Sequence, residues 1–233
     1  MFRFLRTLRL SLLAENRTRK YLLYAIGEIV LVVLGILIAL QIDTWNEVRK
    51  NRAFEKEVLA QIKENLLQDK MVLQAVARSY QEAIAASGKL LDPSKRSAFP
   101  DSIPFWLGRV ARFERFNPLT SSYEVLKSKG LDIVSKDTLR LLLGQYYDDK
   151  TARASLAMED IEYSFNNEWL PLMRDHITDF KFGKYLRVIS MDAFLNNTNI
   201  LRILVMNRDN YSAGLVQVQG VLNHIDTLLS ELP

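Results

Sequence analysis

Apolar side chains follow helical patterns along most of this chain, and the first pattern differs in kind from the others. Residues 21–42 form an almost unbroken apolar run, YLLYAIGEIVLVVLGILIALQI, with Glu28 as its one ionisable side chain. At about 1.5 Å per residue the run makes a helix about 33 Å long, which is enough to cross a bilayer. The pattern therefore predicts a transmembrane helix at 21–42.

The apolar pattern continues past this run, with polar residues between its members. No Pro or Gly interrupts it before Gly88. Its members step mostly by four: Trp45, Val48, Phe54, Val58, Ile62, Leu66, Val72, Val76, Tyr80 and Ile84. This spacing predicts that the spanning helix continues as a long helical rod over 43–91, with the stripe as the core face of a bundle.

The remaining residues, 92–233, predict a helical domain packed on the rod. A polar loop at 92–103 is followed by two short helices. The first runs from Pro104 to near Asn117, and the second covers 119–129 and is ended by Gly130. A long helix is expected from Ser135 as N-cap until it breaks at Pro171; the segment 172–189 fits a turn or brief strand, and 198–232 is helical again. The predicted fold class is all-α, one transmembrane helix continuing into a long helix that packs into an extramembrane helical bundle.

Charge is distributed unevenly around the apolar run. Residues 1–20 carry six basic side chains against one acid, whereas residues 43–233 carry 25 basic and 25 acidic ones. The six basic residues are Arg3, Arg6, Arg9, Arg17, Arg19 and Lys20. Basic flanks stay cytoplasmic, so we expect a cytoplasmic N-terminus. The pI of 9.2 then reflects membrane topology and does not argue for nucleic acid.

Two interpretations of the first 20 residues stay open. They fit a basic amphipathic helix on the anionic cytoplasmic leaflet, or an unstructured positive flank that only fixes orientation. A cleaved signal peptide is disfavoured because the apolar run is longer than usual, contains Glu28 and lacks a small-x-small end. The chain has no Cys, which excludes a lipidated thiol, a disulfide and a thiolate metal site.

One face of the predicted spanning helix carries small residues and the acid. Gly27, Gly35 and Ala39 lie along it at steps of four or eight, and Glu28 projects to nearly the same side. A carboxylate within the membrane costs about 2.5–3.5 kcal/mol on insertion scales, so Glu28 is expected to be protonated, paired or turned to the interface. It fits a contact in an oligomer, a proton site, or a snorkelling acid without a role.

Aromatic residues stand at both ends of the apolar run. Tyr21 and Tyr24 lie at its start, and Trp45 follows it. They fit interfacial anchors, which are ordinary for any spanning helix.

Candidate chemistry is sparse in the rest of the chain. No nucleophile elbow, phosphate-binding glycine loop or HExxH motif is present, and the two histidines, His176 and His224, lack Glu-x-x-His spacing. We therefore expect no metal, no cofactor and no catalytic residue. Three further groups fit surface or core better than a site: the acids Asp148, Asp149, Glu159, Asp160 and Glu162, the aromatic residues Phe105, Trp106, Phe113, Phe116, Tyr146 and Tyr147, and the basic strip Arg109, Arg112 and Arg115.

Two stretches carry a resemblance. The string YAIGEIVLVVLGILIALQIDTWNE and the later SSYEVLKSKGLDIVSKDTLRLLLGQYYD are similar to the two recognisable blocks of a widespread family of uncharacterised bacterial single-pass membrane proteins. The resemblance implies a bacterial inner-membrane anchor with a helical periplasmic domain. It implies no activity.

Three functional hypotheses follow. The first is a membrane-anchored periplasmic scaffold or interaction protein, oligomeric or part of a membrane complex, whose partners are the lipid bilayer and itself or other membrane proteins. The second is a sensor or ligand-binding module acting through a partner, with its small-molecule ligand unknown. The third is a proton-coupled accessory subunit that uses Glu28, by analogy of layout alone.

Overall fold

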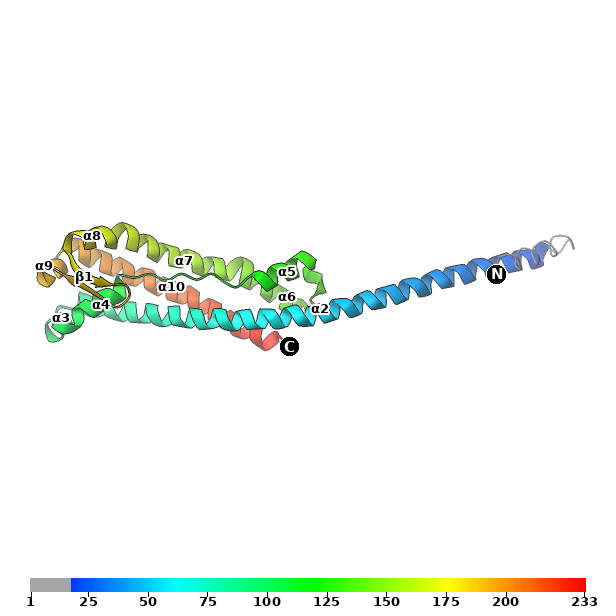
Figure 1. Cartoon of the computed structure of the whole chain (residues 1–233), viewed down its shortest axis with the longest axis horizontal. Helices are drawn as coiled ribbons and strands as arrows, with labels where there is room; N and C mark the ends of the chain where they lie inside the picture. Colours follow the sequence, from blue (N-terminus) through cyan, green and yellow to red (C-terminus); the bar gives the residue numbers. More distant parts are fainter. Residues whose placement is uncertain (1–17) are drawn as a thin grey trace. The chain divides into compact units, whose positions relative to one another are not determined.

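The computed structural model describes residues 18–233, which are helical except for loops and one small hairpin (Figure 1). By its contacts the chain divides into two units, Met1–Phe54 and Glu55–Pro233. Helix α2, Thr18–Leu91, contributes to both. The predicted fold class, an apolar N-terminal helix and a helical bundle, is confirmed.

The described part of the first unit, residues 18–54, is a single stretch of α2. Its large apolar side chains between Leu22 and Val48 are all exposed, with Leu31 at 73%. An exposed apolar surface of this extent on a helix is typical of contact with lipid or with another chain.

The second unit is a bundle of three long helical segments (Figure 1). They are α2 from Glu55 onward, the segment Asp137–His176, and α10, Thr198–Glu231. α10 contacts both α7 and α6 of the middle segment, and side chains of α2 reach both of the other segments.

Two of these helices bury positions that alternate between steps of four and three. On α2 they are Ile62, Leu66, Asp69, Leu73, Val76, Tyr80, Ala83, Ser87 and Leu90. Along α10 and its C-cap they are Ile200, Leu204, Asn207, Tyr211, Gly214, Val218, Val221, Ile225, Leu228 and Leu232. A mean step of 3.5 keeps one seam facing a neighbouring helix, as in coiled coils.

This seam corrects the stripe predicted from the sequence. A strict step of four drifts by about 40° around a helix each time, so it leaves the buried face after a few turns. Val72 is accordingly exposed and Ile84 only half-buried, while Asp69 and Leu73 occupy the seam.

The middle segment is one helical path with two wider turns. α6 (Asp137–Gly144), α7 (Thr151–Ser164) and α8 (Leu170–His176) are joined by the π-helical turns η3 (Gln145–Lys150) and η4 (Phe165–Trp169). The predicted break at Pro171 is wrong, because the helix continues to His176. Pro171 is the second residue of α8, just after η4, where the backbone departs from α-helical hydrogen bonding and accommodates the missing N–H.

Short elements close one end of the bundle. The predicted loop 92–103 instead holds α3 (Pro93–Ala98), capped by the Asp92 side chain, and the 3₁₀ turn η1 (Pro100–Ser102). α4 (Ile103–Val110) follows and ends earlier than predicted. β1 (Ile177–Lys181) and β2 (Tyr185–Val188) pair antiparallel, with Lys181 opposite Tyr185, and precede α9 (Met191–Leu195).

At the other end, α5 (Ser121–Lys129) stops at Gly130, whose φ of 114° suits glycine, and η2 (Leu131–Ile133) leads into α6. The predicted N-cap Ser135 is not a cap. Its backbone N–H and hydroxyl both donate to the Glu55 carboxylate, at 2.7 and 2.8 Å. Between α4 and α5, residues 111–120 form neither helix nor strand; we call them the strap.

Candidate functional site

The residues predicted to make helix contacts in the membrane lie on the exposed surface of α2. Gly27, Glu28, Gly35 and Ala39 are all exposed. A Cβ atom built on Gly27 or Gly35 would meet nothing within 4 Å. No residue of the described chain thus explains why these positions are small, and the role predicted for them stays a prediction.

The predicted anchors and leaflet contacts are only partly described. Trp45 is 63% exposed, and the Arg49 guanidinium carbon lies 5.4 Å from the centroid of its ring. The side chains of Tyr21 and Tyr24 are outside the described part of the structure. The leaflet residues Arg3, Arg6, Arg9 and Arg17 precede the described residues, and only the helical backbone of Arg19 and Lys20 is described.

The basic strip on and after α4 is neutralised by acids of the same unit. Arg109 pairs with Glu82, Arg112 with Glu114, and Arg115 with Glu162. Two of these acids are distant in sequence, so the strip looks unpaired in the sequence alone. Because each guanidinium already has a carboxylate, the strip presents little net positive charge to an anionic partner.

A buried carboxylate sits within the seam of α2. Asp69 is 2% exposed and accepts the Tyr146 hydroxyl at 2.7 Å and the Leu119 backbone N–H at 3.2 Å. Burial raises the pKa of the Asp69 carboxyl, although both hydrogen bonds act to lower it. No motif in the sequence points to Asp69, although steps of four and three residues counted from Ile62 place it in the core.

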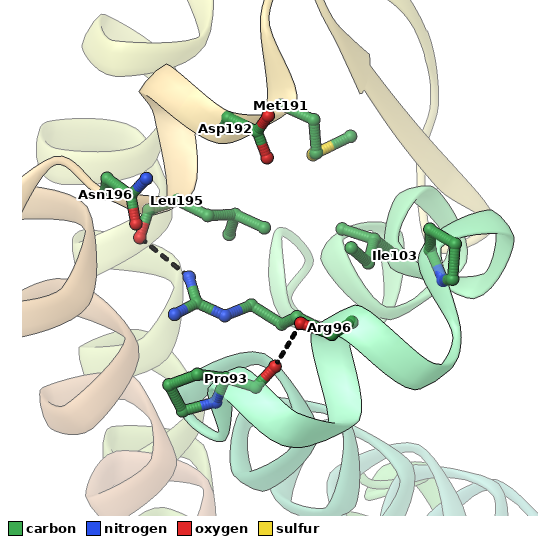
Figure 2. Close-up of a pocket in the computed structure, with 9 residues that line it drawn as sticks. Pro93, Arg96, Ile103, Met191, Asp192, Leu195 and Asn196 are labelled. Carbon is green, nitrogen blue, oxygen red and sulfur yellow. Dashed lines mark hydrogen bonds between the residues drawn. The ribbon is translucent and has the colours of Figure 1, made fainter.

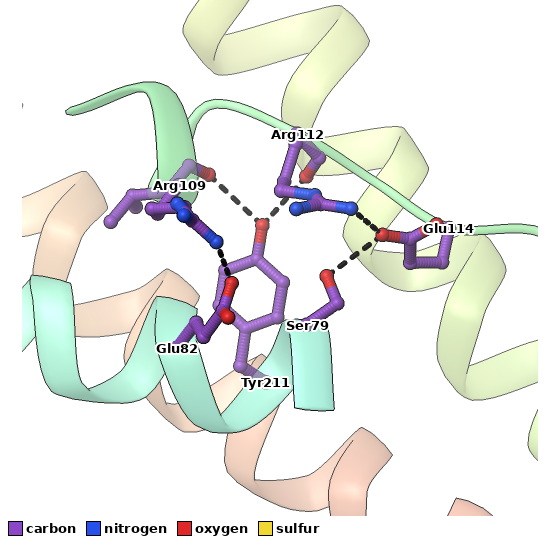
Figure 3. A network of polar contacts seen from close by, with 7 residues as sticks. Ser79, Glu82, Arg109, Arg112, Glu114 and Tyr211 are labelled. Atoms are coloured by element: carbon purple, nitrogen blue, oxygen red, sulfur yellow. Dashed lines mark hydrogen bonds and ion pairs between the residues drawn. The ribbon is translucent and has the colours of Figure 1, made fainter. Parts of the chain in front are cut away.

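A second polar group holds the strap against the bundle (Figure 3). The Tyr211 hydroxyl of α10 lies 2.9 Å from the Val110 carbonyl oxygen and 2.6 Å from that of Arg112. The Ser79 hydroxyl of α2 donates to Glu114 at 2.7 Å. Together with the Asp69–Leu119 bond, these contacts fix both ends of the strap, so the buried polar side chains serve the fold.

Burial shifts the pKa values of three tyrosines and of His224 in the direction that favours their neutral forms. Burial raises the pKa of Tyr146 and Tyr147, and raises that of Tyr123 to about 12. His224 is buried with its Nε2 atom 2.9 Å from the Leu142 carbonyl oxygen, and burial lowers its pKa. His176 packs edge-on against Phe194 instead. Within residues 18–233, no cluster of three His, Asp or Glu side chains is arranged to hold a metal ion.

The other two predicted groups separate in the structure. Phe116, Tyr146 and Tyr147 are buried, whereas Phe105 is 51% exposed. Of the acids, Asp148, Asp149, Glu159 and Asp160 are exposed, and the half-buried Glu162 holds Arg115.

A cavity of about 470 Å³ lies between α3, η1 and α9 (Figure 2). It is at the end of the unit where α2 terminates at Leu91. Arg96 and Asp192 line it together with Ile103, Met191 and Leu195. No sequence pattern predicts this cavity, because its walls come from segments about 90 residues apart.

Fold and sites define a helical domain attached to a strongly apolar helix, without a recognisable catalytic constellation among the described residues. The chain belongs to a family of unknown function, DUF6090, which matches residues 28–159. The match includes Glu28, Gly35, Ala39 and Trp45, and all of the block 121–148. No curated protein matches the chain, and no solved structure does. Membership of an uncharacterised family is thereby confirmed, while its distribution in bacteria stays a prediction.

Proposed function

We propose that this protein is a membrane-anchored helical interaction protein, in which the apolar part of α2 spans the bilayer and associates with a second copy or another membrane chain. One observation carries the proposal. An 18-residue window of α2 is apolar enough to cross a membrane and is 0% buried against the rest of the described chain. A core helix of a soluble protein would bury such side chains within its own chain.

The charge distribution supports a cytoplasmic N-terminus and a helical unit on the outer face of a bacterial inner membrane. Six basic residues precede the apolar run, and the residues after it are electrically balanced. A reporter fused after Pro233 tests this. Alkaline phosphatase, active only outside the cytoplasm, is expected to be active, and a fluorescent protein that folds only in the cytosol is expected to be dark. The reverse pattern would overturn the orientation.

Small residues on one face of α2 support association. Gly27, Gly35 and Ala39 allow another helix to approach its backbone closely, since none of residues 18–233 fills the space beside the two glycines. Glu28 adds a carboxyl on nearly the same face, exposed to whatever surrounds the helix. In lipid such a group gains from a hydrogen-bonding partner on a neighbouring helix.

The association test is a matched pair of substitutions in the intact chain. Gly35→Ile places a branched side chain on the proposed contact face, and Leu37→Ile puts the same residue about 200° away around the helix. Crosslinking in native membranes is expected to give several-fold less crosslinked species for Gly35→Ile and an unchanged amount for Leu37→Ile. Equal crosslinking in both variants would show that this face makes no contact.

A further inference from the structure

The cavity between α3 and α9 is a concavity that opens to solvent and has charged residues in its walls. Its volume of about 470 Å³ falls in the range of small-molecule sites, about 300–1,000 Å³. α3 and η1 form one side, and α9 forms the other (Figure 2). It lies in the helical unit alone and does not depend on how the membrane helix associates.

The two charged side chains of the cavity approach it from opposite sides. Arg96 extends from α3 beneath it, and Asp192 points in from α9 (Figure 2). Within residues 18–233 neither side chain forms an ion pair with the other or with any third residue. Opposite charges that share a cavity without pairing are each available to a ligand.

The Arg96 guanidinium is already oriented by one bond. Its Nη1 atom donates to the Leu195 carbonyl oxygen at 2.9 Å, which leaves its other N–H groups uncommitted. The Asp192 carboxylate has no hydrogen-bond partner among the described residues. A planar guanidinium fixed in this way presents a fork that suits a carboxylate.

Apolar side chains line the cavity between and beside the two charged residues. Leu195 and Ile103 point toward the cavity from α9 and α4, and Met191 lies beside Asp192 (Figure 2). Ile103 and Leu195 are almost fully buried, so this wall is built into the core of the unit. A ligand here meets a cation, an anion and an apolar wall together.

We propose that this cavity binds a zwitterion with an apolar side chain, either a free α-amino acid or a dipeptide. The ligand carboxylate would pair with Arg96, its ammonium with Asp192, and its apolar side chain would lie against Ile103, Met191 and Leu195. A simple anion would meet repulsion from Asp192, and a simple amine would meet repulsion from Arg96. Only a molecule that carries both charges satisfies both walls.

The probes are L-leucine and L-leucyl-L-leucine, titrated calorimetrically into the purified full chain in detergent micelles. N-acetyl-L-leucine lacks the ammonium group and L-leucinamide lacks the carboxylate. Each is expected to bind at least tenfold more weakly than L-leucine, because one charged wall then has no counter-charge. Equal binding of N-acetyl-L-leucine would show a plain anion site and overturn the proposal.

Substitutions test whether Arg96 and Asp192 each contribute to ligand binding. Arg96→Gln and Asp192→Asn are each expected to weaken L-leucine binding at least tenfold. The controls Lys95→Gln and Asp101→Asn remove neighbouring charges of α3 and η1 that do not line the cavity, and they should bind as the parent does.

Arg96→Gln also loses the bond to Leu195, so its thermal melt must be measured alongside. Asp192→Asn breaks no side-chain bond and therefore tests the proposal without that complication. If neither leucine nor the dipeptide binds at about 10 mM, or if Asp192→Asn binds as the parent does, the proposal is wrong.

Discussion

Removing the Tyr146 hydroxyl should destabilise the bundle because it takes a donor from a buried carboxylate. The hydroxyl donates to Asp69 at 2.7 Å, and the remaining donor, the Leu119 N–H, is longer at 3.2 Å. A hydrogen bond to an ionised group contributes about 1.5–3 kcal/mol, and one between neutral groups about 0.5–1.5 kcal/mol. For Tyr146→Phe at pH 7 we expect a loss of about 2 kcal/mol.

Thermal unfolding of the full chain in micelles measures this loss. It is followed by tryptophan emission, to which Trp169 contributes from the core of the bundle. For a domain of this size, 1 kcal/mol corresponds to about 2–4 °C in Tm, so the expected decrease is about 4–8 °C. Tyr163→Phe removes a hydroxyl from an exposed tyrosine and serves as the matched control, with Tm unchanged.

The raised pKa of Asp69 determines how the stability of the bundle changes with pH. Burial raises the pKa of Asp69, so between its ordinary pKa and the raised one the folded state holds a proton that the unfolded state has lost. Stability due to this group therefore falls as pH rises through the folded pKa. Tyr146→Phe removes an interaction that lowers this pKa and should deepen that fall.

A double-mutant cycle decides whether the carboxylate is responsible. In an Asp69→Asn background the acceptor is neutral, so Tyr146→Phe should cost about 1 kcal/mol or less. If the hydroxyl costs the same in both backgrounds, the charge on Asp69 has no part in the effect and the reasoning fails.

Two further predictions concern packing and protonation. A Cβ atom on Gly108 would lie 2.3 Å from the Tyr185 backbone nitrogen, so Gly108→Ala should cost more than about 2 kcal/mol, whereas Gly220→Ala, with nothing within 4 Å, should gain about 0.5–1 kcal/mol. Urea unfolding compares the two, and equal effects would contradict the close packing of α4 on β2. Burial lowers the pKa of His224, so below about pH 6.5 the unfolded state binds a proton more readily than the folded state does. The free energy of unfolding therefore decreases as the pH is lowered. His224→Gln should reduce the change in Tm between pH 7 and pH 5. If the change in Tm is the same as in the parent protein, other titratable groups cause the pH dependence.

Elements whose cause is local can be predicted from the residues alone. The apolar run at 21–42, the long helix after it, the helical class of the rest and the cap at Gly130 all follow from side-chain period and backbone preference within a few residues. The hairpin was only suggested, and α3 was missed because a short helix after a proline resembles a polar loop.

Which polar residues are buried and which charges are paired depends on packing between distant segments. Asp69 and Tyr211 are polar residues that would suit the surface, but the seam places both of them in the core. There Asp69 accepts hydrogen bonds from Tyr146 and Leu119, and Tyr211 donates to the strap. In the sequence Arg109 and Arg115 belong to an unpaired basic strip. In the fold they pair with Glu82 and Glu162, which come from other helices. Burial and pairing depend on neighbours far away in the sequence, and the cavity of Arg96 and Asp192 exists only because folding brings two distant segments together.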